Sequence, residues 1–134
     1  MAGRNLHDEI VALETVALDR WCKGDPSGFL EISAPDVVYF DPFLERQIHG
    51  LAALTAYYES LRGKVSATHH EIIDPVVIDL GGAAALNFRF LSRNAKGDEF
   101  RWNCTEVYRR TEDGWRIVQT HWSFTARPPV GVAG

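Results

Sequence analysis

Apolar side chains recur at helical spacing in the first part of this chain and alternate with polar ones in the last part. Between residues 6 and 21 the apolar positions fit one face of a helix, which predicts a single amphipathic helix. Asn5 is suited to cap the start of this helix, and Gly24 stands just past its end. The apolar face of the predicted helix comprises Leu6, Ile10, Leu13, Ala17 and Trp21.

Two shorter helices and one strand are expected next. Asp25-Pro26 is typical of a cap followed by a first-turn proline, and it predicts a second helix that runs through Ile32. Residues 36–41 form an apolar run that predicts a strand. Residues 50–61 again show helical spacing and predict a third helix, closed by a glycine.

The rest of the chain predicts strands. Residues 69–79, 83–94, 99–110 and 115–125 are rich in apolar and aromatic side chains, with a kink expected at Pro75 in the first segment. Helices followed by hairpin-linked strands are typical of an α+β domain. A chain of 134 residues suits one compact domain. We therefore expect a single domain over residues 1–125 and a loose or partner-bound tail over residues 126–134.

Composition and charge argue against several classes of function. The net charge of -4 and the absence of a basic patch argue against nucleic-acid binding. Without a long apolar run or a secretion signal, the chain is expected to have no membrane partner and to be cytoplasmic. Cys22 and Cys104 lack metal-ligand spacing and are expected to be reduced. His69 and His70 are adjacent on a strand and point to opposite faces, so no metal site is expected.

Asp41 is the first candidate for chemistry. It ends the apolar strand over residues 36–41 and directly precedes Pro42, so a carboxylate is expected at the edge of the hydrophobic interior. Loss of water raises the pKa of a carboxyl group, as a general base or acid near neutral pH requires. The alternative is structural, because Asp before Pro commonly opens a turn.

Glu106 is the second candidate. Successive side chains of a strand face opposite sides of the sheet, and the alternation puts Glu106 on an otherwise apolar and aromatic face. Two alternatives stay open at this position, since Glu106 could pair with a buried Arg or the register could be shifted by one residue. The predicted inner face comprises Leu86, Phe88, Phe90, Trp102, Cys104, Glu106, Tyr108, Val118, Thr120, Trp122 and Phe124.

Several short motifs along the chain carry a resemblance to a known family. They are Asp41-Pro42-Phe43, Ile48-His49-Gly50, Ala56-Tyr57-Tyr58, Gly63-Lys64-Val65, Glu106-Val107 and His121-Trp122-Ser123. With them the chain resembles bacterial ketosteroid isomerase in the nuclear-transport-factor-2-like (NTF2-like) superfamily, and it is similar to the SnoaL-like and kinase-association-domain branches. The resemblance implies a cone-shaped α+β fold, in which a curved antiparallel sheet wraps around N-terminal helices and encloses a pocket.

The resemblance also implies roles for individual residues. Asp41 matches the general base, and Glu106 matches the protonated acid that donates to the developing enolate. Tyr58 matches a tyrosine that supports the oxyanion hole, and Tyr39 is a possible second donor beside Asp41. The ligand-binding residues are expected to be Ala17, Trp21, Tyr39, Phe88, Phe90, Trp102, Cys104 and Trp122.

Ala17 departs from the family. It stands where the family has the oxyanion-hole tyrosine, and the loss of one such donor costs about 100- to 1000-fold in rate. Steroid isomerisation is therefore not expected of this chain.

Two classes of function remain open. The first is an isomerase, dehydratase or cyclase without a cofactor, in which Asp41 moves a proton and neutral Glu106 stabilises the charge that develops. The second is a non-catalytic ligand-binding or association domain. In both, the expected ligand is a small apolar molecule with a carbonyl, hydroxyl or amine group. A homodimer is expected through the outer face of the sheet, which carries Asn87, Arg89, Gln119 and His121.

Overall fold

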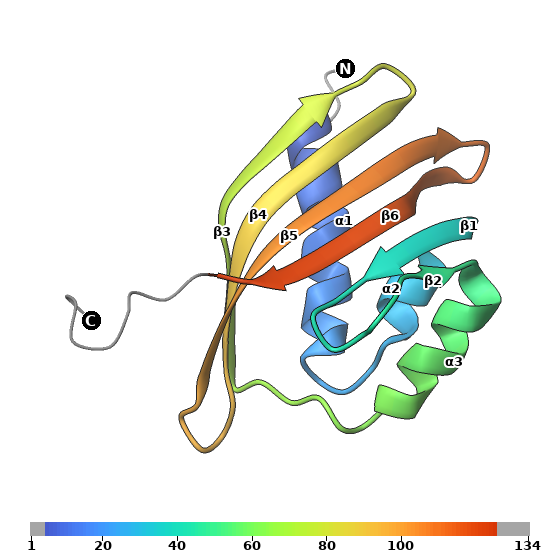
Figure 1. Cartoon of the computed structure of the whole chain (residues 1–134). Coiled ribbons are helices and arrows are strands. Elements are labelled where there is room, and N and C mark those ends of the chain that lie inside the picture. Colours follow the sequence, from blue (N-terminus) through green and yellow to red (C-terminus); the bar gives the residue numbers. More distant parts are fainter. Residues whose placement is uncertain (1–4, 126–134) are drawn as a thin grey trace.

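The computed structural model describes residues 5–125, and within them three helices lie on one side of a curved sheet (Figure 1). The helices are α1 (Leu6–Trp21), α2 (Ser27–Glu31) and α3 (Leu51–Leu61). The strands are β1 (Ser33–Phe40), β2 (Ile48–His49), β3 (His69–Asp79), β4 (Ala83–Arg93), β5 (Glu99–Thr111) and β6 (Gly114–Phe124). The predicted α+β class is confirmed. The predicted tail over residues 126–134 lies outside the described residues.

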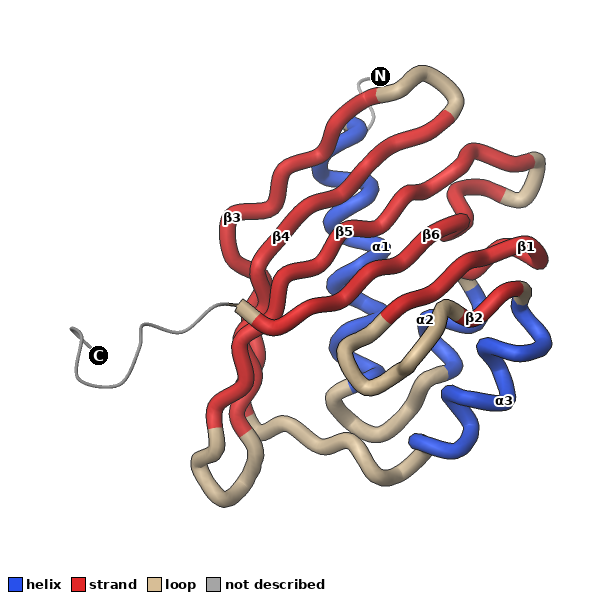
Figure 2. The backbone as a smooth tube through the Cα atoms, viewed as in Figure 1, coloured by secondary structure: helices blue, strands red, loops and turns tan. Residues whose placement is uncertain are grey.

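The sheet has six strands in the order β2-β1-β6-β5-β4-β3 (Figure 2). Its neighbours are antiparallel except β1 and β6, which run parallel. Parallel neighbours need a long crossover, and here that connection contains α3 and the strands between β1 and β6 in the sequence. The sequence prediction did not include β2, because two residues are too few to show a period.

The first helix packs its apolar face against the sheet, largely as the spacing predicted. Asn5 caps it by accepting a hydrogen bond from the backbone N–H of Asp8 at 2.8 Å. Ile10 and Ala17 of the predicted face are fully buried, and Leu18 joins them. In the described part of the chain, no helix is both long and apolar enough to cross a bilayer.

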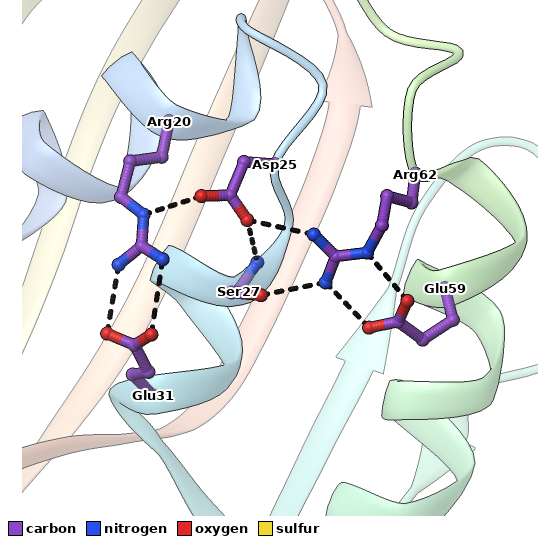
Figure 3. A network of polar contacts seen from close by, with 6 residues as sticks. All are labelled: Arg20, Asp25, Ser27, Glu31, Glu59 and Arg62. Carbon is purple, nitrogen blue, oxygen red and sulfur yellow. Dashed lines mark hydrogen bonds and ion pairs between the residues drawn. The ribbon is translucent and has the colours of Figure 1, made fainter.

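A polar network ties α3 to the turn between α1 and α2 (Figure 3). Asp25 accepts hydrogen bonds from Arg20 at 2.8 Å and from Arg62 at 3.0 Å, and the Arg20 bond is the main cause that holds the pKa of Asp25 below its usual value. The backbone is joined nearby, since the Gly63 N–H donates to the Gly24 carbonyl at 2.9 Å. These contacts fix the helix that carries Tyr57 and Tyr58.

Two irregularities in the strands matter for side-chain directions. The expected kink at Pro75 is a bulge between Ile73 and Val76, where Asp74 has a φ of 51°. A second bulge between Val107 and Tyr108 shifts the β5–β6 register. Because of this shift, Tyr108 pairs with Ile117, which is 1% exposed. The prediction that Val118 faces inward was therefore wrong, since Ile117 takes that place.

Candidate functional site

One row of side chains crosses four strands at the centre of the sheet. Tyr39 on β1 pairs with Thr120 on β6, Thr120 pairs with Glu106 on β5, and Glu106 pairs with Leu86 on β4. All four residues are buried, and Glu106 is 0% exposed. The inward direction predicted for Glu106 is therefore confirmed, and the register was not misjudged at this position.

Glu106 is held by a hydroxyl donor and a second carboxyl group rather than by an arginine. Thr120 Oγ1 donates a hydrogen bond to Glu106 Oε2 at 2.7 Å. Burial raises the pKa of Glu106 well above its ordinary value, and the neighbouring Glu14 raises it further. Burial and the neighbouring Glu14 therefore favour the protonated form of Glu106, in which its O–H group is a hydrogen-bond donor.

Glu14 is a site residue that the sequence interpretation missed. It is 0% exposed on α1 and accepts a hydrogen bond from the Tyr108 hydroxyl at 2.7 Å. Burial raises the pKa of Glu14, while hydrogen bonds from Glu106 and Tyr108 oppose the rise. A signal for Glu14 did exist, because it lies four positions after Ile10 and four before Leu18 on one helical face.

Asp41 follows β1 at the edge of the interior, where it is half-buried. Its Oδ2 atom accepts hydrogen bonds from Tyr39 at 2.8 Å and from Tyr57 at 2.6 Å. Its Oδ1 atom accepts one from the backbone N–H of Phe43 at 2.8 Å. The predicted turn is therefore present, and the two tyrosines add contacts that a simple turn does not need.

Tyr57 and Tyr58 have different surroundings, although they are adjacent on α3. Tyr57 bonds to Asp41, whereas Tyr58 is 3% exposed and packs on Trp21 with ring centroids 4.9 Å apart. Tyr58 also meets Tyr39 edge to face at 5.4 Å. Burial raises the pKa of Tyr58 well above its ordinary value, and the neighbouring carboxyl group of Glu106 adds to the rise. The sequence interpretation named Tyr58 and missed Tyr57.

Aromatic side chains occupy the same face of the sheet on one side of Glu106. Trp122 meets Phe88, Phe90 and Trp102 with centroids 5.8–5.9 Å apart. Trp102 stacks on Phe124 at 4.4 Å, and Phe124 is 45% exposed. The exposure of this face therefore increases from Glu106 towards the end that carries Phe124.

The remaining predicted ligand-binding residues are in the core. Cys104 lies two residues from Glu106 on β5, is 3% exposed and has its pKa raised by burial. Ala17 is 1% exposed, and its Cα lies 3.2 Å from the position that a Cβ on Gly28 would take. Ala17 is thus at a close contact between α1 and α2.

Asp41 and Glu106 line neither of two surface cavities that lie within residues 5–125. One of about 140 Å³ lies between α1 and β3, where His70 Nε2 is 2.7 Å from Asp19 Oδ1. The other, of about 270 Å³, lies on the outer face of the sheet over Asn87 and Arg89. The predicted internal pocket between Asp41 and Glu106 therefore stays a prediction.

Residues 15–120 match the SnoaL-like domain family. The chain belongs to this family. The matched residues include α1 from Thr15 onward, Asp41, Glu106 and Thr120, so the family covers most of the candidate site.

Solved structures with the same fold place this SnoaL-like chain among NTF2-like proteins. A protein of Parabacteroides distasonis, provisionally named a ketosteroid isomerase, is 41% identical, with 95% of this chain and 92% of that chain covered and a TM-score of 0.83. An NTF2-like protein of unknown function from Pseudomonas putida is 23% identical, with coverages of 91% and 96% and a TM-score of 0.79. The CaMKII hub of S. rosetta is 18% identical, with coverages of 92% and 100% and a TM-score of 0.75. No curated protein matches the chain.

Proposed function

We propose that this SnoaL-like protein binds a small apolar molecule through a carbonyl or hydroxyl oxygen and moves a proton on that molecule without a cofactor. The observation that supports the proposal is Glu106, a carboxyl group that is 0% exposed at the inner end of an aromatic face and whose burial favours its protonated form. A neutral acid in an apolar site donates a strong hydrogen bond to an oxygen that gains negative charge. The 41% identity to the protein named a ketosteroid isomerase is consistent with this chemistry.

The strand register supports a route for the ligand to Glu106 along the aromatic face. Along β5, Trp102 and Cys104 precede Glu106 on the same face, and across the ladder they pair with Phe124 and Trp122. Apolar walls of this kind bind flat, apolar molecules, and rings stack on them. A ligand that reaches Glu106 along this face displaces side chains from their contacts, because Glu106 itself is fully buried.

Asp41 is the candidate base. It lies two residues beyond Tyr39, on the same side of β1 and nearer to the aromatic end. Neighbouring strands are about 4.8 Å apart, so the Cα atoms of Tyr39 and Glu106, two strands apart, are separated by about 10 Å. A ligand of bicyclic size spans such a distance. In this reaction the carbonyl oxygen faces Glu106, and Asp41 takes a proton from the carbon beside the carbonyl group.

The exchange of such a proton can be followed directly. The bicyclic ketone 1-tetralone carries exchangeable protons beside its carbonyl group, and NMR in D₂O measures their replacement by deuterium with and without the protein. We expect protein-dependent exchange in the wild type. In Asp41→Asn it should fall about 100-fold or more, with binding of 1-tetralone retained, because a positioned base contributes about 100- to 10,000-fold.

The matched control is Asp36→Asn. Asp36 is also a carboxylate on β1, but its side chain is exposed and paired with Arg109. Exchange should be unchanged in this variant and reduced in Glu106→Gln. Binding without exchange in the wild type would refute the catalytic part of the proposal, and absence of binding would refute the ligand site as well.

The second candidate is a homodimeric association domain. It is favoured by Val76 and Ile78 on the outer side of β3, which are 55% and 49% exposed. They adjoin a polar ladder in which Thr105 donates to Asn87 at 3.2 Å. Analytical ultracentrifugation should show a dimer in the wild type and a monomer when both Val76 and Ile78 are replaced by Lys. A monomer in both proteins would refute this candidate.

A further inference from the structure

The carboxyl groups of Glu14 and Glu106 each have one oxygen in use and one without a donor. Glu14 Oε1 accepts from Tyr108, and Glu106 Oε2 accepts from Thr120, both at 2.7 Å. Within the described residues, no hydroxyl, amide or cation is bonded to Glu14 Oε2 or Glu106 Oε1. The two carboxyl groups also lie within hydrogen-bond reach of each other, and a proton between them satisfies oxygen atoms that lack another partner.

The surroundings of the pair offer no compensating charge. The titratable groups that act on it are Tyr108 and Cys104 from β5 and Tyr58 from α3. Tyr39 interacts with Tyr58 in turn, and Asp41 is hydrogen-bonded to Tyr39. No Lys, Arg or His of residues 5–125 forms an ion pair with Glu14 or Glu106. When the pair holds one proton and Glu106 carries it, the negative charge on Glu14 is therefore stabilised chiefly by the O–H groups of Glu106 and Tyr108.

A ligand changes this balance if it takes the hydrogen bond of Glu106. The Glu106 O–H group then points to the ligand oxygen, and Glu14 keeps only the donor from Tyr108. An ionised carboxylate in the core with one donor is costly, and the cost is removed when a proton from solvent binds to Glu14. The balance is one proton taken up for each ligand bound, with no other bond made or broken.

We propose that Glu14 couples ligand binding at Glu106 to the uptake of one proton, so that the site holds a neutral oxygen ligand more tightly as the pH falls. This inference rests on the proposed function, because it needs a ligand that accepts from Glu106. Glu14 acts here as a positioning residue, since it does not touch the ligand. Its partner Tyr108 tunes the effect by stabilising the ionised form of Glu14.

The test uses 1-tetralone, which has no titratable group near neutral pH. Isothermal titration calorimetry in buffers with different heats of ionisation counts the protons taken up on binding. For the wild type we expect uptake of about one proton per ligand bound. The affinity should fall up to about tenfold for each unit by which the pH rises, over the range where Glu14 takes up the proton on binding. In Glu14→Gln we expect uptake near zero and an affinity that does not change with pH. Tyr108→Phe should lie between the two, because Glu14 is then partly protonated before the ligand binds.

A second measurement uses only the wild-type protein, so it does not depend on whether a variant folds. In wild-type protein, infrared difference spectroscopy should show an added carbonyl band of a protonated carboxyl group when 1-tetralone binds. Binding without proton uptake, or uptake that persists in Glu14→Gln, would overturn the inference and leave the proposed function standing. Absence of binding at every pH would overturn both proposals.

Discussion

The Tyr57 hydroxyl donates a hydrogen bond to Asp41 Oδ2 at 2.6 Å across 16 positions of the sequence. This bond joins α3 to the segment after β1, and Tyr39 donates to the same oxygen atom. The orientation of Asp41 therefore depends on a helix as well as on its own strand.

Loss of the Tyr57 hydroxyl should weaken the fold moderately. Tyr57 and Asp41 are both half-buried, so water replaces part of the lost bond, and we expect Tyr57→Phe to lower the free energy of unfolding by about 1 kcal/mol. A double-mutant cycle with Asp41→Asn in urea unfolding isolates the pair. A coupling energy indistinguishable from zero would show that the bond does not hold Asp41.

Stability should fall as the pH rises above 5. The folded pKa values of Glu14 and Glu106 are raised above the ordinary 4.5, so the folded state holds a proton that the unfolded state has released. The resulting stability is full below pH 4.5 and is lost as the pH rises towards the folded pKa values, by at most about 1.4 kcal/mol per pH unit for one proton.

Urea unfolding of the wild type and Glu106→Gln between pH 5 and 9 checks this expectation. The variant should show a flatter profile, because its amide side chain does not titrate. Carboxylates with lowered pKa values, such as Asp25 and Glu59, oppose the trend only in more acidic solution. A wild-type stability that rises over this range would contradict the assignment of a buried proton.

Gly24 and Gly63 should differ in their tolerance of alanine. Both have positive φ, 84° and 77°, so either substitution strains the backbone by about 1–2 kcal/mol. A Cβ on Gly24 would also lie 3.1 Å from the Gly63 Cα, whereas a Cβ on Gly63 meets nothing within 4 Å. Thermal unfolding should therefore show a clearly larger loss for Gly24→Ala. Equal losses would mean that the two loops separate easily.

Asp25 should contribute more to stability than Asp36. Asp25 links Arg20, Arg62 and a backbone N–H, while Asp36 pairs with Arg109 at a more exposed site. We expect Asp25→Ala to lower the midpoint of urea unfolding more than Asp36→Ala does, because Asp25 has more partners and is less exposed. The reverse order would show that the network in Figure 3 does not hold α3 in place.

The candidate site could be predicted from the sequence only where strand alternation governs it. Glu106 and Thr120 share the inner face because a period of two carries through both strands. Val118 was misassigned because the bulge after Val107 leaves no signal in the apolar pattern.

Helix patterns alone did not reveal Glu14. A glutamate is ordinarily expected to be exposed, and what makes its burial tolerable is the Tyr108 hydroxyl, 94 positions away. Tyr57 was not identified as a site residue for the same reason. Its partner Asp41 follows β1 and becomes its neighbour only because α3 packs on that strand. Partners of this kind are set by tertiary contacts rather than by local spacing.

The place of β6 between β1 and β5 has a consequence for biosynthesis. During translation, β1 leaves the ribosome long before β6, and the two must meet as parallel neighbours in the middle of the sheet. Until then Glu106 has no Thr120 beside it, and the nascent chain exposes the unpaired edges of β1 and β5. Folding of the centre is thus expected to be late and slow, with the core carboxyl groups dehydrated only when the last strand of the sheet is inserted.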